Sequence, residues 1–215
     1  MNAAVLFSGG KDSALAAILL SRDYDVELIT FLFGPGQVAG EVTTAAEEIG
    51  FPHRTRQFGP GVLSHAADMV ITCGFPNDAI NMVHLCAVTI LAKEYRVVAD
   101  GTRFNDRVPR LPRSEVQRLW NLYGCSYVRP LLGYPKAEVD RLVARFLVVC
   151  QGENGSIGNG DYEREIRAEV KAKGHDPGTL FPGHHESASN EAETYDTRSG
   201  FHGRGNRPER GRGLC

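Results

Sequence analysis

The chain has 215 residues, 42% hydrophobic and 23% charged, with a formal net charge of −2. This composition predicts one globular domain with a sizeable core, and it gives no overall attraction to nucleic acid or to a membrane. The five cysteines, at positions 73, 86, 125, 150 and 215, form no C-x-x-C pair, so no compact zinc site is indicated. The first apolar run is too short for a signal peptide or a membrane span, and we expect a cytoplasmic protein with free thiols.

Strands and helices are predicted to alternate along the chain. Short apolar or β-branched runs predict strands at residues 3–7, 26–33, 53–58, 96–99 and 126–128. Helical periodicity predicts helices at residues 13–22, 38–49, 60–73, 77–95, 112–123, 136–146 and 161–174. This alternation indicates an α/β fold, an open and mostly parallel five-stranded sheet with helices on both faces. Ligands on such sheets bind beyond the carboxyl ends of the strands, where the strand order reverses.

The end of the chain differs in composition from the rest. Residues 1–182 are predicted to form the folded domain, whereas residues 183–215 lack hydrophobic periodicity and are rich in Asn, Ser, Glu, Gly and Arg. We expect this tail to be disordered. An Arg/Gly segment could also bind RNA, which stays open as the less favoured alternative.

A polar loop joins the first strand to the first helix. Its sequence is Ser8-Gly9-Gly10-Lys11-Asp12-Ser13. Two glycines allow backbone N–H groups to approach an anion, and the helix start adds N–H donors and the positive end of the helix dipole. The loop fits neither the Walker A pattern nor the dinucleotide pattern G-x-G-x-x-G. The residues therefore predict a polyphosphate cradle of another type.

The loop resembles the S-G-G-x-D-S signature of the PP-loop ATP pyrophosphatases, which have the HUP-type sheet of the adenine nucleotide alpha hydrolase-like fold. Members cleave ATP between the α and β phosphates and adenylate a substrate, which a nitrogen or sulfur nucleophile then attacks. The resemblance implies that Ser8, Gly9, Gly10 and Ser13 hold pyrophosphate, with Lys11 at the variable position. It also implies that Asp12 assists with Mg²⁺ or with loop order.

Two further segments match the same family. After the fourth strand, Gly101, Thr102 and Arg103 precede Asp106, and the resemblance places an Mg²⁺-binding acid at that position. Carboxylate oxygen is a ligand type that Mg²⁺ prefers. Residues 130–139 resemble the pattern P-L-x-x-x-x-K-x-E-V, which makes Lys136 the candidate for a helix-start lysine that reaches phosphate.

Phe31 lies in the last three residues of the second predicted strand, at the edge that meets adenine in the family, although a phenylalanine there is more often a core residue. Residues 1–182 are also similar to small archaeal PP-loop proteins labelled "alpha hydrolase". The shared segments are residues 75–77, 100–103, 106–109, 130–134, 160–163 and 181–182.

These observations favour an enzyme that uses ATP and Mg²⁺. The first interpretation is an AMP-forming ligase of the amidation type that acts on an unknown small-molecule acceptor. The second is a tRNA-modifying (thiolating) enzyme, although the chain lacks the C-x-x-C pairs that such enzymes usually carry. The third is a non-catalytic ATP sensor. A homodimer is allowed, and a membrane partner is not expected.

Overall fold

The computed structural model describes residues 1–34, 40–152, 162–182 and 192–197, with side chains described only outside 148–152 and 192–197. Its centre is a five-stranded sheet in the order β3-β2-β1-β4-β5, and every strand pair in it is parallel. The strands are β1 (Asn2–Leu6), β2 (Asp25–Leu32), β3 (His53–Gln57), β4 (Val97–Ala99) and β5 (Ser126–Val128). The predicted α/β class and five-stranded sheet are confirmed.

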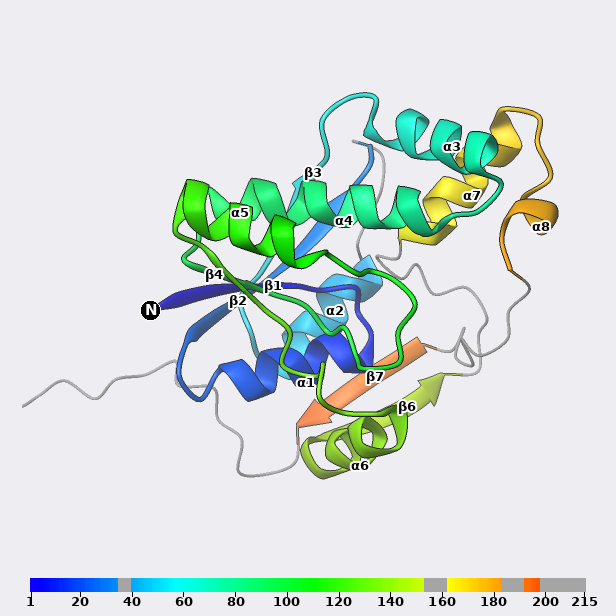
Figure 1. Ribbon diagram of the computed structural model, residues 1–215. Coiled ribbons are helices and arrows are strands. Elements are labelled where there is room, and N and C mark those ends of the chain that lie inside the picture. Colours follow the sequence, from blue (N-terminus) through cyan, green and yellow to red (C-terminus); the bar gives the residue numbers. More distant parts are fainter. Residues whose placement is uncertain (35–39, 153–161, 183–191, 198–215) are drawn as a thin grey trace, which may run out of the picture.

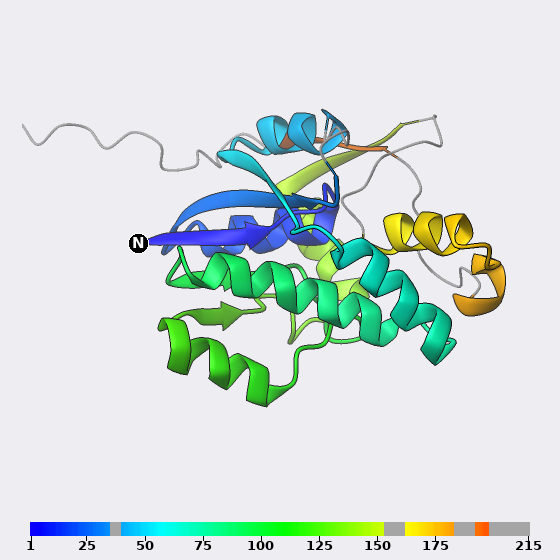
Figure 2. The ribbon, with the colours of Figure 1, turned by 90° about the horizontal axis from the view of Figure 1, so that it is seen from above.

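Helices cover both faces of the sheet (Figure 1). One face carries α1 (Lys11–Leu20), α2 (Gly40–Ile49) and α6 (Lys136–Phe146). The other carries α3 (Val62–Cys73), α4 (Asn77–Ala92), α5 (Arg113–Tyr123) and α7 (Tyr162–Ala172). Figure 2 shows α7 and the short α8 (Pro177–Leu180) beside α3 at one end of the domain.

The alternation of side chains along β1 divides the core into two layers. Ala4 and Leu6 pack with α3 and α4, whereas Val5 and Phe7 pack with α1 and α2. All four side chains are buried, which explains why the strand is a continuous apolar run. Helix α1 is buried along most of its length between β1 and α6, so its start is held rigidly at the end of the sheet.

The chain order creates a switch point between β1 and β4. From β1 the chain proceeds outward through β2 and β3, then crosses back to place β4 on the other side of β1 and β5 beyond it. The segments that follow β1 and β4 therefore leave neighbouring strands in opposite directions. This is the arrangement that opens a ligand crevice at the carboxyl edge of a parallel sheet.

Two strands were not predicted from the sequence. Strand β6 (Leu147–Gly152) follows α6 directly and pairs in antiparallel fashion with β7 (Ala192–Thr197). Strand β7 lies within the segment 183–215 that we expected to be disordered, and the other residues of that segment lie outside the described part of the chain. Helix α2 is described from Gly40, because 35–39, where its start was predicted, are also outside.

Candidate functional site

The loop between β1 and α1 has the backbone shape that its glycines suggest. Gly9 has a φ of +85°, a conformation that side chains other than glycine rarely adopt, and an added Cβ would lie 3.3 Å from Cγ2 of Val42 in α2. Gly10 is extended and precedes α1 without a side-chain cap. The first turn of α1 therefore presents its N–H groups and positive dipole end at the sheet edge.

Ser13, the last residue of the loop, stabilises the loop conformation. Ser13 is 5% exposed, and its hydroxyl donates to the Gly10 carbonyl at 2.8 Å. This bond tightens the turn into α1. The hydroxyl of Ser13 therefore stabilises the loop from within.

The segment after β4 lies directly against the start of α1. A Cβ added to Gly101 would be 2.6 Å from the backbone nitrogen of Ser13 and 2.7 Å from the carbonyl carbon of Asp12. Only a residue without a side chain fits at this distance. The two loops at the switch point are therefore packed backbone to backbone.

Arg103 lies between the two carboxylates that the sequence singled out. Its Nε is 3.3 Å from Asp12 Oδ2, and its Nη2 is 2.8 Å from Asp106 Oδ1. Asp106 Oδ2 also accepts from the backbone N–H of Arg103 at 2.6 Å. Burial alone would lower the pKa of Arg103, but the hydrogen bond to Asp106 and the charge of Asp12 raise it above its ordinary value.

Two lysines converge on one carboxylate of α6. Lys11 Nζ is 3.2 Å from Asp140 Oδ1, and Lys136 Nζ is 2.8 Å from Asp140 Oδ2. Burial opposes ionisation of Asp140, yet the hydrogen bonds from Lys136 and Lys11 hold its pKa below the ordinary value. The start of α6 is thus connected to the start of α1 by a pair of positive charges that share one acid.

A buried polar cluster of Asp100, His84 and Tyr127 lies at the end of β4. Asp100 is 4% exposed, and its carboxylate lies 2.8 Å from Nε2 of His84 in α4 while it accepts the hydroxyl of Tyr127 in β5. Burial would raise the pKa of Asp100, but the bonds from His84 and Tyr127 lower it. Burial and the Asp100 charge raise the pKa of Tyr127 well above its ordinary value. These contacts fix β4, β5 and α4 relative to one another.

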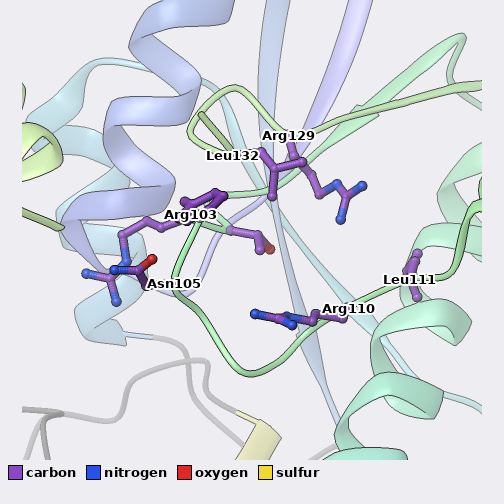
Figure 3. Close-up of a pocket in the computed structure, with 8 residues that line it drawn as sticks. Arg103, Asn105, Arg110, Leu111, Arg129 and Leu132 are labelled. Carbon is purple, nitrogen blue, oxygen red and sulfur yellow. The ribbon is translucent and has the colours of Figure 1, made fainter. Parts of the chain in front are cut away.

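A pocket of about 680 Å³ opens beside this group (Figure 3). It lies between the segment that follows β4 and the segment that follows β5. Its lining residues are Thr102, Arg103, Phe104, Asn105, Arg110, Leu111, Arg129 and Leu132. None of these belongs to the loop of residues 8–13, so the pocket is a neighbour of that loop. The volume is in the range of small-molecule sites.

The predicted residues occupy one end of the sheet, with two differences of detail. The loop residues 8–13, Gly101, Arg103 and Lys136 follow β1, β4 and β5, so the fold brings them together. Phe31 is 4% exposed and stacks on Phe58 with ring centroids 4.7 Å apart, so its side chain is a core residue. Both oxygens of Asp106 accept hydrogen bonds from Arg103, so the arginine occupies the carboxylate predicted to meet Mg²⁺.

Arg110 and Arg129 were not singled out from the sequence, although both line the pocket. Arg129 comes directly after β5, at the sheet edge where ligands bind, and this position was the available signal. Within the described ranges, no group of three or more His, Cys, Asp or Glu side chains could hold a metal ion. The described helices also include none long and apolar enough to span a membrane.

Fold and site together define a doubly wound α/β protein with the loop of residues 8–13 at its switch point. The chain belongs to the family DUF7411, a family of unknown function whose model matches residues 1–191. Uncharacterized protein MJ0690 of Methanocaldococcus jannaschii is 39% identical over 190 residues, which are 87% of this chain and 94% of that protein. The relationship therefore spans nearly the whole length of both chains.

Solved structures also resemble the protein. The crystal structure of a "predicted subunit of tRNA methyltransferase" from Methanocaldococcus jannaschii superposes with a TM-score of 0.77 at 35% identity, covering 92% of this chain and 96% of that one. An NMN synthetase from Francisella tularensis gives a TM-score of 0.37 at 14% identity, covering 85% of this chain and 89% of that one. The second similarity is too low to support an argument about function.

Proposed function

We propose that the protein is an AMP-forming ATP pyrophosphatase of the PP-loop type, which adenylates an acceptor for attack by a nitrogen or sulfur nucleophile. The observation that carries this proposal is the S-G-G-K-D-S loop at the switch point, where its backbone forms the start of α1 and packs against Gly101. Helix starts of this kind bind phosphate through N–H groups and the helix dipole.

Positive side chains around the loop support a polyphosphate ligand. Lys11 and Lys136 both pair with Asp140, so two positive charges lie together where α1 and α6 begin. A lysine at a helix start is disfavoured by the dipole, and a bound anion removes that conflict. We therefore propose that Lys11 and Lys136 bind the phosphates of ATP.

The residues of the site fit Mg²⁺ in part. Mg²⁺ in nucleotide enzymes is held by one or two carboxylates together with phosphate oxygens. Asp12 belongs to the loop, at the start of α1, and its Oδ2 lies 3.3 Å from Nε of Arg103; its position in the loop makes it the ligand candidate. Asp106 is bound by Arg103 at both oxygens, and we assign it to positioning that arginine. A bound Mg²⁺ would neutralise charge on the departing pyrophosphate.

The chemistry left to the protein is positioning and charge stabilisation. The loop N–H groups and the two lysines stabilise negative charge as the bond between the α and β phosphates breaks. Arg103 lies between Asp12 and the pocket, so its charge faces the junction of nucleotide and acceptor. No side chain of the described residues stands out as a general base.

The test is product analysis with α-labelled ATP and Mg²⁺, with and without bulk tRNA. We expect AMP, and we expect Asp12→Ala to reduce AMP formation about 100-fold or more, whereas Arg113→Ala, an exposed charge change on α5, leaves it intact. ADP as the product would refute the proposal.

A tRNA-modifying activity is the second candidate. The observation that favours it is the 35% identical structure described as a predicted subunit of a tRNA methyltransferase. AMP that forms only when tRNA is added would select this candidate over a small-molecule ligase. ATP binding with no turnover under either condition would favour a sensor.

A further inference from the structure

The pocket between the segments that follow β4 and β5 is lined by none of the residues of the loop 8–13. Its lining comes from residues 102–105, 110–111, 129 and 132, and one of these, Arg103, forms an ion pair with Asp12 of the loop of residues 8–13. The ATP loop lies on the β1 side of the switch point, and this pocket lies on the β4 and β5 side. We therefore expect a compound in this pocket to leave the loop of residues 8–13 accessible to a nucleotide.

Two arginines extend into the pocket from opposite walls (Figure 3). Arg110 is anchored because its Nε donates to the Asp106 carbonyl at 2.8 Å. Arg129 lies over the ring of Tyr127 at 5.5 Å, and Tyr127 is itself fixed by Asp100. In the part of the chain that the structure describes, neither arginine pairs with a carboxylate. Guanidinium groups in this arrangement bind phosphate with paired hydrogen bonds.

Thr102 adds an independent sign of a polar ligand. It lines the pocket and is 4% exposed, and its Oγ1 has no hydrogen-bond partner among the described residues. A buried hydroxyl without a partner is rare in folded proteins, because leaving it unbonded is unfavourable. An oxygen-bearing ligand in the pocket would supply the missing acceptor.

The rim of the pocket is apolar and exposed. Phe104 is 64% exposed and Leu132 is 38% exposed, and both line the pocket. The backbone N–H of Phe104 donates to the Tyr134 carbonyl at 3.4 Å, which connects the segments that follow β4 and β5. An exposed aromatic ring beside arginines is a common stacking platform for nucleobases.

We propose that this pocket binds a nucleotide-type acceptor, with its phosphate on Arg110, Arg129 and Thr102 and its base on Phe104. The assignment of the bound compound as the acceptor rests on the proposed ATP pyrophosphatase function. The pocket volume of about 680 Å³ is sufficient for one nucleotide. The nucleotide can be free or part of an RNA chain, because both offer the same phosphate and base.

The experiment is calorimetric titration of uridine 5′-monophosphate into the full chain saturated with an ATP analogue that has a methylene group between the α and β phosphates. A pyrimidine nucleotide avoids direct competition for an adenine site. We expect binding in the presence of the analogue, weakened about 10- to 100-fold by Arg110→Ala or Arg129→Ala. Phe104→Ala should weaken it about tenfold.

The matched control is Arg113→Ala, which removes the same charge three residues from Arg110 but outside the pocket lining. It should leave affinity within about twofold. Each variant is compared with the unmodified chain for its melting temperature and its affinity for the ATP analogue, so that misfolding is recognised. Arg110→Lys and Arg129→Lys, which keep the charge, provide a second set for any alanine variant that fails to fold.

A parallel titration with bulk tRNA identifies the source of the nucleotide. Binding of tRNA that weakens in the Arg110 and Arg129 variants, without binding of the monophosphate, supports the pocket with RNA as its ligand. Three results would overturn the proposal. The monophosphate could compete with the ATP analogue, the pocket variants could leave binding unchanged, or neither the monophosphate nor tRNA could bind.

The two proposals fail in different ways. If the protein forms AMP but its pocket variants bind the nucleotide as well as the unmodified chain does, the acceptor-pocket proposal is refuted and the pyrophosphatase proposal stands. If a nucleotide binds in the pocket but ATP is converted to ADP, the pyrophosphatase proposal is refuted and the pocket remains a nucleotide site.

Discussion

A methyl group added at Gly101 tests whether the two switch-point loops must touch. The Cβ of Gly101→Ala would lie 2.6 Å from the nitrogen of Ser13 and 2.9 Å from the carbonyl oxygen of Asp12. All of the close atoms belong to the backbone of α1, which cannot rotate away as a side chain could. The strain must therefore move one loop relative to the other.

The expected magnitude follows from these distances. Ordinary contact begins at 3.4 Å, so the nearest pair must separate by about 0.8 Å. Overpacking of this kind costs about 1–3 kcal/mol. In a domain of this size, that cost lowers the melting temperature by about 2–12 °C. A shift approaching 1 Å at a reacting centre lowers the rate of chemistry about 100-fold.

The assay pairs thermal unfolding with calorimetric binding of ATP and measurement of AMP formation. Gly59→Ala is the matched control, because nothing lies within 4 Å of a Cβ at that position. We expect Gly59→Ala to match the unmodified protein within about 0.5 kcal/mol. If Gly101→Ala has the melting temperature and ATP affinity of the unmodified protein, close packing of the two loops is not required and the reasoning is refuted.

Three further substitutions probe the charges around the loops. Hydrogen bonds lower the pKa of Asp100, so its stabilisation is present above the ordinary pKa of about 3.9 and is lost as the pH falls through the lowered value. Unfolding temperature against pH should therefore fall more steeply below about pH 4 in the unmodified protein than in Asp100→Asn; parallel curves would contradict this. Tyr127→Phe deprives the Asp100 carboxylate of a buried donor and should cost about 1–3 kcal/mol in denaturant unfolding, and an unchanged midpoint would exclude a role for the hydroxyl. Lys136→Ala breaks an exposed ion pair worth about 0–1 kcal/mol but should weaken ATP binding about tenfold, and unchanged affinity would remove this lysine from the phosphate site.

The main sheet could be predicted because its signals are local. Each strand is a short run with a turn after it, and the buried α1 follows a glycine pair directly. Strands β6 and β7 lacked such signals. Strand β6 begins at the residue after α6 ends, with no glycine or proline between them, and its partner lies about 40 residues later in a polar segment. Pairing over that distance depends on tertiary structure, which periodicity does not report.

The site shows the same division between local and spatial information. The loop of residues 8–13 has its chemistry in consecutive residues, so its location at the sheet edge followed from the strand and helix around it. The partner of Asp106 could not be found in this way, because it depends on how the Arg103 side chain folds back. Arg110 and Arg129 are 19 positions apart in sequence, and they line one pocket because β4 and β5 are neighbouring strands.

Arg103 connects the two halves of the site and lies where each proposed ligand would bring negative charge. It pairs with Asp12 on the ATP side and lines the pocket on the acceptor side. If Asp12 turns to Mg²⁺ when ATP binds, Arg103 keeps its bonds to Asp106 and loses only the contact at 3.3 Å. Bound ATP and Mg²⁺ together still carry negative charge, so Arg103 then has to offset both this charge and that of a phosphate-bearing acceptor in the pocket. Its position between the two is therefore the electrostatic condition for both compounds to be bound at once.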